Sequence, residues 1–166
     1  MSRERFDWLK NVASEVIATP GTESNVKEIF DKTHELRATR EDVWILNQFE
    51  QMGNYMWHYN VTGNAIAEAF EEMKGENDRL FGMAFTSGSA GTMASGDRLK
   101  ELYPGAKLAV GEALQCPTLL DNGFGAHRIE GIGDKHVPWI HNVKNTDMVI
   151  DIDDEDSQNI LRLFNE

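Results

Sequence analysis

The sequence predicts an α/β fold with a mostly parallel sheet that helices cover on both faces. Short apolar runs alternate along the chain with longer stretches of helical composition. These runs are continuously apolar, which is typical of strands that are buried on both faces of a parallel sheet. A glycine-rich loop joins one run to the helical stretch after it, as expected for a right-handed strand–helix–strand unit.

The first half of the chain alternates predicted helices with β-type segments. Helical composition or spacing marks three ranges: residues 3–11, 23–39 and 55–74. Two apolar segments favour β structure: residues 14–20, and residues 43–49 as a short strand of the buried type. Thr22 or Ser24 is a candidate N-cap for the second helix, and Thr62 or Asn64 is a candidate internal start of the third.

The second half supplies the clearer strand and helix pattern. Strands are predicted for three apolar runs: residues 80–87, 107–114 and 147–153. Helices are predicted for residues 91–105, which Pro104 and Gly105 end, and for residues 154–166, with Asp153 as N-cap. Residues 115–147 are irregular. The glycine-rich loop lies at the carboxyl end of a predicted strand, where parallel sheets bind their ligands.

Composition and charge restrict the class of protein. With 166 residues and 40% hydrophobic residues, the chain is long enough for one domain with a real core. A net charge of −12 disfavours binding to nucleic acid or to an anionic membrane. The single cysteine, Cys116, cannot form an internal disulfide and fits a reducing compartment. Because the N-terminus also has no signal-peptide pattern, we expect a cytoplasmic protein.

The glycine-rich loop is the strongest local motif. Residues 84–96 read AFTSGSAGTMASG, with little side chain between the predicted strand and helix. Backbone N–H groups can surround an anion only where side chains are small, and the N-terminus of the following helix adds positive potential. The loop therefore predicts a monophosphate site formed by the N–H groups of residues 88–92 and the hydroxyls of Ser89 and Thr92.

Three other interpretations of this loop were weighed. A nucleoside-triphosphate loop is excluded because no lysine follows Gly91. A dinucleotide loop has a different glycine spacing, but Glu112 lies at about the right distance for an acidic ribose ligand, so this alternative stays open. A tight strand-to-helix turn without any ligand also stays open.

Three motifs together resemble one enzyme family. They are GSAGT at 88–92, NQFEQMGNYMWHYNVTG upstream, and HRIEGIG downstream. In this order and spacing they are similar to the fold-type II pyridoxal-phosphate enzymes of the cysteine synthase family, which also include threonine dehydratase and the tryptophan synthase β chain. The upstream motif matches the family at Gln48, Phe49, Asn54, His58, Thr62 and Gly63. The resemblance covers nearly the whole chain.

The resemblance implies a cofactor, a reaction and site residues. The cofactor would be pyridoxal 5'-phosphate, and the reaction would be β-elimination or β-replacement on an amino acid. Five residues would bind the cofactor phosphate: Gly88, Ser89, Ala90, Gly91 and Thr92, with Ala90 in place of the glycine that is usual in the family. Gly131 and Gly133 would line the cofactor site, and Gln48 would lie near the substrate carboxylate. Residues 1–47 would belong to the smaller domain and 48–166 to the larger domain of a homodimeric full-length enzyme.

Other parts of the family pattern have no match. The Schiff-base lysine segment, the asparagine loop against the cofactor ring and the C-terminal serine or threonine are not found, so we assign no catalytic residue. We expect a central fragment that is inactive alone: a truncated or proteolytic core, one half of a split enzyme, or a relic. A non-catalytic binding or assembly domain is the main alternative. The acidic run DIDDED and the histidines near Asp134 fit no metal pattern, and we predict no metal site.

Overall fold

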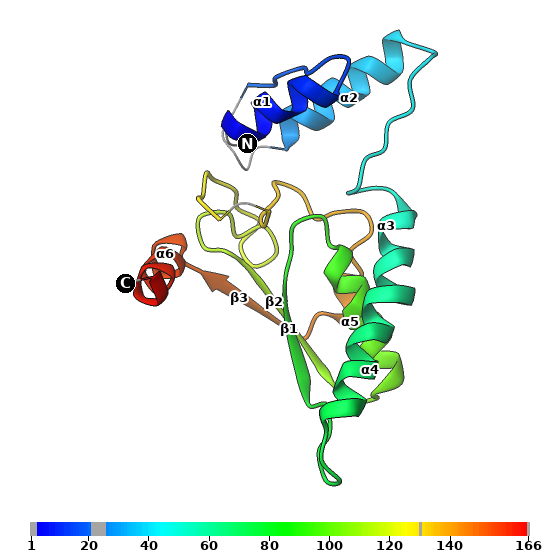
Figure 1. Cartoon of the computed structure of the whole chain (residues 1–166), viewed down its shortest axis with the longest axis vertical. Coiled ribbons are helices and arrows are strands. Elements are labelled where there is room, and N and C mark those ends of the chain that lie inside the picture. The colour runs from blue at the N-terminus through cyan, green and yellow to red at the C-terminus, as the bar shows by residue number, and fades with distance from the viewer. Residues whose placement is uncertain (1–2, 21–25, 130, 166) are drawn as a thin grey trace.

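The computed structural model describes residues 3–20, 26–129 and 131–165 (Figure 1). The helices are α1 (Arg3–Val12), α2 (Lys27–Thr39), α3 (Met52–Trp57), the π-helical η1 (His58–Thr62), α4 (Gly63–Met73), α5 (Gly91–Leu102), the 3-10 turn η2 (Val143–Asn145) and α6 (Asp154–Asn165). The strands are β1 (Gly82–Thr86), β2 (Lys107–Ala113) and β3 (Met148–Ile152). All three strands of the second half occur where the sequence predicts them.

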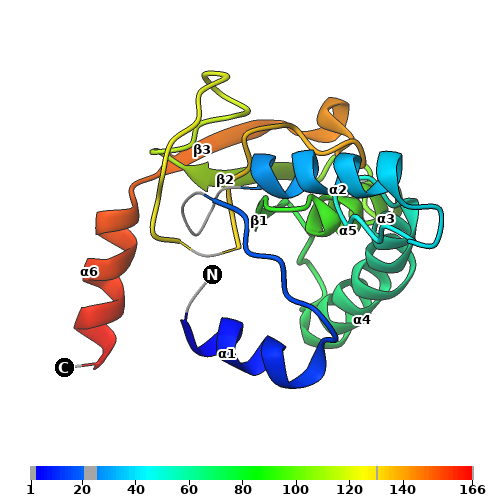
Figure 2. The ribbon, with the colours of Figure 1, turned by 90° about the horizontal axis from the view of Figure 1, so that it is seen from above.

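The strands form one parallel sheet in the order β1-β2-β3. Phe85 of β1 is paired with Val110 of β2, which is paired with Val149 of β3. Figures 1 and 2 show α3, α4 and α5 on one side of this sheet and α6 on the other side. The predicted α/β class, with a parallel sheet flanked by helices, is confirmed.

The core lies between β2 and α5. Its buried members are Ala90, Met93, Leu108, Val110 and Ile140. The pleat of β2 turns Leu108 and Val110 toward α5, because alternate side chains of a strand point to the same face. The helix approaches the strand closely, since a Cβ on Gly96 would lie 2.9 Å from Cδ2 of Leu108. This packing fixes the start of α5, and with it the glycine-rich loop, relative to the sheet.

The predicted helix over residues 55–74 is continuous and contains a π-helical turn. Helix α4 begins at Gly63 with Thr62 in the N-cap position, so one of the two candidate internal starts coincides with a helix boundary. Thr62 keeps helical dihedral angles and its side chain forms no capping hydrogen bond, because the π-turn continues directly into α4. The carbonyl of His58 accepts a hydrogen bond from the N–H of Gly63, in the i, i+5 pattern of a π-helix, and a second one from the Ser95 hydroxyl at 3.1 Å. The π-turn and α5 lie close together, since a Cβ on Gly63 would be 2.8 Å from Cβ of Arg98.

Two β-type predictions of the first half are wrong. Residues 14–20 and 43–49 take part in no sheet of the described chain. Trp44 and Leu46 are 93% and 86% exposed, which is the opposite of a buried strand. An extended segment becomes a strand only where a neighbour pairs with its N–H and C=O groups, and no described strand runs beside either segment.

The sequence predicts N-caps for two helices, and the structure describes one of these two positions. The N–H of Glu155 donates to Oδ1 of Asp153 at 2.9 Å, so the predicted N-cap of α6 is confirmed. The candidate caps Thr22 and Ser24 lie outside the described residues.

Figure 2 shows α6 extending away from β3, on the side opposite to α3 and α4. In the part of the chain that is described, no helix combines the length and the apolar character needed to cross a membrane.

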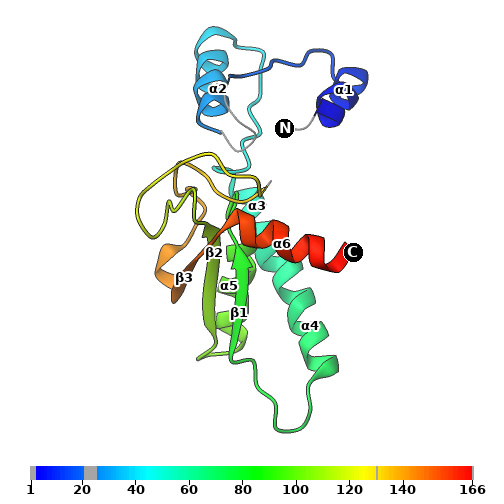
Figure 3. The same cartoon turned by 90° about the vertical axis from the view of Figure 1, so that its left-hand side faces the viewer.

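The first two helices lie near the carboxyl ends of the strands. Figures 1 and 3 show α1 and α2 beyond that edge of the sheet. The ring of Phe30 on α2 stacks on His136 with centroids 6.0 Å apart and meets Phe49 edge-on at 5.3 Å. Lys135 and Glu28 form a long ion pair of 3.9 Å at the same place. These contacts bring α2 to the edge of the sheet where the loop lies.

Candidate anion-binding site

The glycine-rich loop connects β1 to α5 at the carboxyl edge of the sheet. Ala90 has φ 64° and ψ 11°, which is the left-handed region, and the next residue, Gly91, begins the right-handed α5. Neighbouring residues of opposite hand point successive N–H groups into one concavity, which is the backbone arrangement of anion-binding nests. The position of Ala90 matches the loop position where the family usually has glycine, and the positive φ gives the physical reason for that glycine.

The backbone of the loop keeps donors free. No N–H group of residues 88–92 donates a hydrogen bond to another residue in the described part of the chain. The first N–H groups of a helix have no intrahelical acceptor, and the loop adds further ones just before them. The loop therefore presents a group of unpaired N–H donors at the positive end of α5.

The two hydroxyls of the loop differ in availability. The Oγ of Ser89 accepts a hydrogen bond from Nδ2 of Asn54 at 3.2 Å, which leaves its own hydrogen for another acceptor. The Thr92 hydroxyl donates to the carbonyl of Thr86 at 3.0 Å. Its hydrogen is used within the loop, so Ser89 is the better hydroxyl donor and Thr92 contributes its N–H group.

Two segments enclose the loop from opposite sides. On one side, a Cβ on Gly91 would lie 2.5 Å from Cδ2 of His58 and 2.7 Å from Oδ1 of Asn54. On the other side, a Cβ on Gly88 would overlap the carbonyl oxygen of Gly131. The N–H of Gly133 donates to the carbonyl of Ser87 at 2.9 Å. The loop backbone thus lies against side-chain atoms at Gly91 and against backbone atoms at Gly88, which explains why both positions are glycine.

Gln48 lies in a turn beside the loop. Residues 48–50 form the turn that precedes α3, and the Gln48 side chain is exposed. The backbone carbonyl of Gln48 accepts a hydrogen bond from Nδ2 of Asn54 at 2.8 Å. The same amide nitrogen contacts Ser89, so Asn54 joins the Gln48 turn to the loop. The structure thus brings together Gln48, the loop, Gly131 and Gly133, which are far apart in the sequence.

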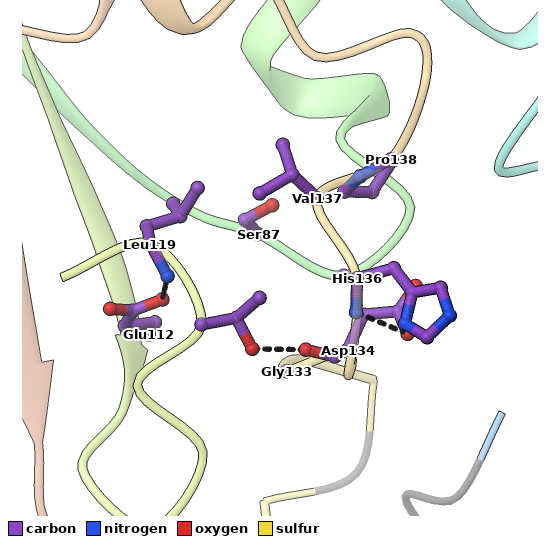
Figure 4. Close-up of a pocket in the computed structure, with 10 residues that line it drawn as sticks. Ser87, Glu112, Leu119, Gly133, Asp134, His136, Val137 and Pro138 are labelled. Carbon is purple, nitrogen blue, oxygen red and sulfur yellow. Dashed lines mark hydrogen bonds between the residues drawn. The ribbon is translucent and has the colours of Figure 1, made fainter. Parts of the chain in front are cut away.

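A small pocket borders the loop (Figure 4). Its walls include Ser87, Gly88, Glu112, Gly133 and Asp134. Asp134 is only 5% exposed, and its Oδ1 accepts a weak hydrogen bond of 3.3 Å from the N–H of His136. Its Oδ2 is buried without a hydrogen-bond partner among the described residues. Burial raises the pKa of Asp134 to about 6, because the charged form loses its hydration.

Glu112 stabilises a turn rather than facing a ligand. It is 3% exposed, and its two carboxylate oxygens accept hydrogen bonds from the N–H groups of Leu119 and Leu120 at 2.8 and 2.9 Å. Burial raises its pKa against the opposing effect of these bonds. The acidic residue on which a dinucleotide site would depend is therefore turned to the protein interior.

Known proteins resemble this chain over almost its whole length. A probable cysteine synthase of Bacillus subtilis is 34% identical over 163 residues, which make up 98% of this chain and 51% of that protein. Cysteine synthase B of Campylobacter jejuni is 29% identical over 96% of the chain and 51% of its own length. The chain is homologous to the cysteine synthases.

Solved structures agree with this homology. A hydrogen sulfide-producing enzyme of Fusobacterium nucleatum matches 98% of the chain with a TM-score of 0.83 and 25% identity, over 53% of that enzyme. A cysteine synthase of Entamoeba histolytica matches 98% of the chain with a TM-score of 0.80 and 26% identity, over 46% of its length. The chain spans about half the length of the cysteine synthases it matches. It matches no family model.

Two residues of this cysteine synthase homologue have structural roles that the sequence did not indicate. Asn54 matches the family motif, but its bridge between Gln48 and Ser89 appears only when the turn and the loop are folded together. No spacing in the sequence indicates this bridge, because Asn54 and Ser89 are far apart along the chain. Asp134 was considered only as a metal ligand. In the described residues, no group of three or more acidic, histidine or cysteine side chains is arranged to hold a metal ion.

Proposed function

We propose that this chain supplies the cofactor-phosphate site of a pyridoxal 5'-phosphate-dependent enzyme that performs β-elimination or β-replacement on an amino acid. The observation that carries the proposal is the loop 88–92, whose unpaired N–H groups lie at the N-terminus of α5 and the carboxyl edge of the sheet. The homology to cysteine synthases supports the reaction class.

The residues present fit the phosphate of this cofactor. The N–H groups of residues 88–92 hold its oxygens, and the Ser89 hydroxyl donates a further hydrogen bond. The backbone of Gly131 and Gly133, next to the loop, lines the space for the ring. Gln48, on the turn tied to the loop, binds the substrate carboxylate. When bound, the cofactor supplies an electron sink for reactions at the α-carbon of amino acids.

The domain assignment and assembly belong to the same proposal. Residues 1–47 form part of the smaller domain and residues 48–166 part of the larger, phosphate-binding domain. We assign no proton-transfer role to any residue of the chain, so the chain by itself binds without turnover. The full enzyme acts as a homodimer on a small amino-acid substrate.

A titration with pyridoxal 5'-phosphate tests this function. We expect saturable binding that inorganic phosphate competes away, and much weaker binding of pyridoxal, which has the same ring without the phosphate. Substituting Ser89→Ala is expected to weaken binding by roughly tenfold, because a hydrogen bond to a charged group is lost. Ser157→Ala is the matched control, because the Ser157 hydroxyl only bonds the carbonyl of Asp153 on α6.

The competing outcomes separate the alternatives. Binding that phosphate does not compete, or no binding of the cofactor, contradicts the proposal and favours a non-catalytic binding or assembly domain. Preferential binding of a dinucleotide such as NAD supports the oxidoreductase alternative instead. Equal binding by the Ser89→Ala variant and the unmodified chain would show that the Ser89 hydroxyl does not contact the phosphate.

A further inference from the structure

Asn54 connects the glycine-rich loop to the turn that carries Gln48. Its side-chain amide nitrogen has two hydrogens, and two oxygens lie within hydrogen-bond distance of it. They are the carbonyl of Gln48 at 2.8 Å and the Oγ of Ser89 at 3.2 Å. Both donors of the amide nitrogen are therefore used, and both are used to join these two segments.

The carbonyl of Gln48 determines the orientation of the amide. A backbone carbonyl can only accept, so the Asn54 nitrogen rather than its oxygen must face it. The Asn54 Oδ1 then faces the Cα of Gly91, where the absence of a side chain gives it room. The backbone carbonyl of Gln48 thus determines which side-chain atom of Asn54 is the nitrogen, and the oxygen lies beside Gly91.

This orientation determines what the Ser89 hydroxyl can do. A hydroxyl has one donor hydrogen and two acceptor lone pairs. Because the Asn54 nitrogen donates to Oγ, the hydroxyl acts as acceptor toward Asn54 and its hydrogen points elsewhere. Among the described residues, no other group forms a hydrogen bond with this hydroxyl. Its hydrogen remains available beside the unpaired N–H groups of the loop.

We propose that Asn54 is a positioning residue that holds the Ser89 hydroxyl as a donor toward a bound phosphate and keeps the Gln48 turn in register with the loop. The part concerning phosphate rests on the proposed function. The part concerning the rotamer of Ser89 does not, because it describes the free protein. Asn54 itself does not contact the ligand.

Two measurements on the full chain test this role. In the free protein, the Hα–Hβ scalar couplings of Ser89 report its χ1 rotamer. We expect couplings of a single rotamer in the unmodified chain and rotamer-averaged couplings in Asn54→Ala. In a titration with inorganic phosphate, we expect Asn54→Ala to weaken binding by roughly two- to tenfold, the range for one neutral hydrogen bond.

A double-mutant cycle separates positioning from general loosening. If Asn54 acts through Ser89, Asn54→Ala costs no further affinity once Ser89→Ala has removed the hydroxyl. Asn60→Ala is the matched control, because the Asn60 side chain bonds the carbonyl of Met56 on the same helical segment without touching the loop. It is expected to leave both the couplings and the affinity unchanged.

The outcomes distinguish this inference from the function on which it partly rests. Averaged Ser89 couplings in the unmodified chain, or unchanged couplings in Asn54→Ala, overturn the positioning role whatever the protein binds. Additive losses in the cycle overturn it as well. Altered couplings together with no phosphate binding by the unmodified chain support the positioning of Ser89 and contradict the proposed function.

Discussion

The Cα of Gly91 lies directly against the ring of His58. A Cβ on Gly91 would be 2.5 Å from Cδ2 of His58, closer than carbon atoms can approach without displacement. Gly91→Ala must therefore move the loop away from the π-helical turn, and we expect a loss of about 1–3 kcal/mol in the free energy of unfolding. Urea denaturation measures this loss.

The control for that substitution is Gly53→Ala. Gly53 is also helical, but a Cβ there meets no atom within 4 Å. Alanine is expected to stabilise this position by about 0.5–1 kcal/mol, because it lowers the entropy of the unfolded chain and favours the helix. Equal stability of the two variants would show that the loop does not pack on His58 as described.

Ala90 is strained in a way that its substitutions reveal. It is held at φ 64° and is 1% exposed within the core. Glycine at this position would remove about 1–2 kcal/mol of strain from the left-handed conformation but would also lose about 0.8 kcal/mol from the burial of the methyl group. We therefore expect the free energy of unfolding of Ala90→Gly to lie within about 1 kcal/mol of that of the unmodified chain. Ala90→Val combines β-branching with overpacking and should destabilise by more than about 2 kcal/mol. Thermal unfolding measures the stability of both variants. An Ala90→Val variant as stable as the unmodified chain would contradict the left-handed conformation of residue 90.

Asp134 makes stability depend on pH. Its pKa is about 6 in the folded protein against 3.8 for an unperturbed carboxyl. The unfolded chain then ionises more readily than the folded one, so this group lowers stability as the pH rises from about 4 to about 6. The full effect is about 3 kcal/mol at most, from two units of pKa.

The Asp134→Asn variant isolates this effect. We expect its stability relative to the unmodified chain to increase between pH 4 and pH 6 and then to remain constant. The pKa values of His127 and His141 are lowered by burial, which acts in the opposite sense with pH, but these histidines are common to both proteins. Denaturation curves at several pH values measure this difference in stability, and a difference that does not vary with pH contradicts a raised pKa for the buried Asp134 carboxyl.

Glu112 should be important for the turn after β2. Glutamine has only one acceptor oxygen for the N–H groups of Leu119 and Leu120. Its NH₂ group would face the second N–H, so that two donors would meet without an acceptor. We expect Glu112→Gln to cost about 1–3 kcal/mol. Glu68→Gln on the exposed side of α4 is the control and should change stability by less than about 0.5 kcal/mol. Comparable melting temperatures of the two variants would argue against a capping role.

The sequence predicted the second half of the fold better than the first. Residues 80–87, 107–114 and 147–153 became strands because each apolar run has a neighbour to pair with. Residues 43–49 have the same local pattern, but no described strand lies beside them, and a local pattern cannot supply a partner. The π-turn at 58–62 could not be predicted either, because the side-chain pattern of residues 55–74 does not distinguish it from an ordinary α-helical turn.

The same limit applies to the candidate site. The loop 88–92 could be proposed as an anion site from the sequence, because the small residues that such a site needs are contiguous there. The pocket beside it joins Glu112 to Asp134 across an irregular segment with no periodicity to place either side chain. The different uses of the Ser89 and Thr92 hydroxyls depend on single contacts with Asn54 and Thr86, which no spacing reveals.

The measurement that tests the central claim most directly is an amide ¹H–¹⁵N titration of the full chain with pyridoxal 5'-phosphate. The account predicts saturating shifts at the N–H groups of residues 88–92, reversed by inorganic phosphate. The N–H of Gly105, which lies just beyond the C-terminal end of α5, is expected to remain unchanged. Shifts that avoid the loop, or that persist in excess phosphate, would show that these N–H groups do not hold the cofactor phosphate.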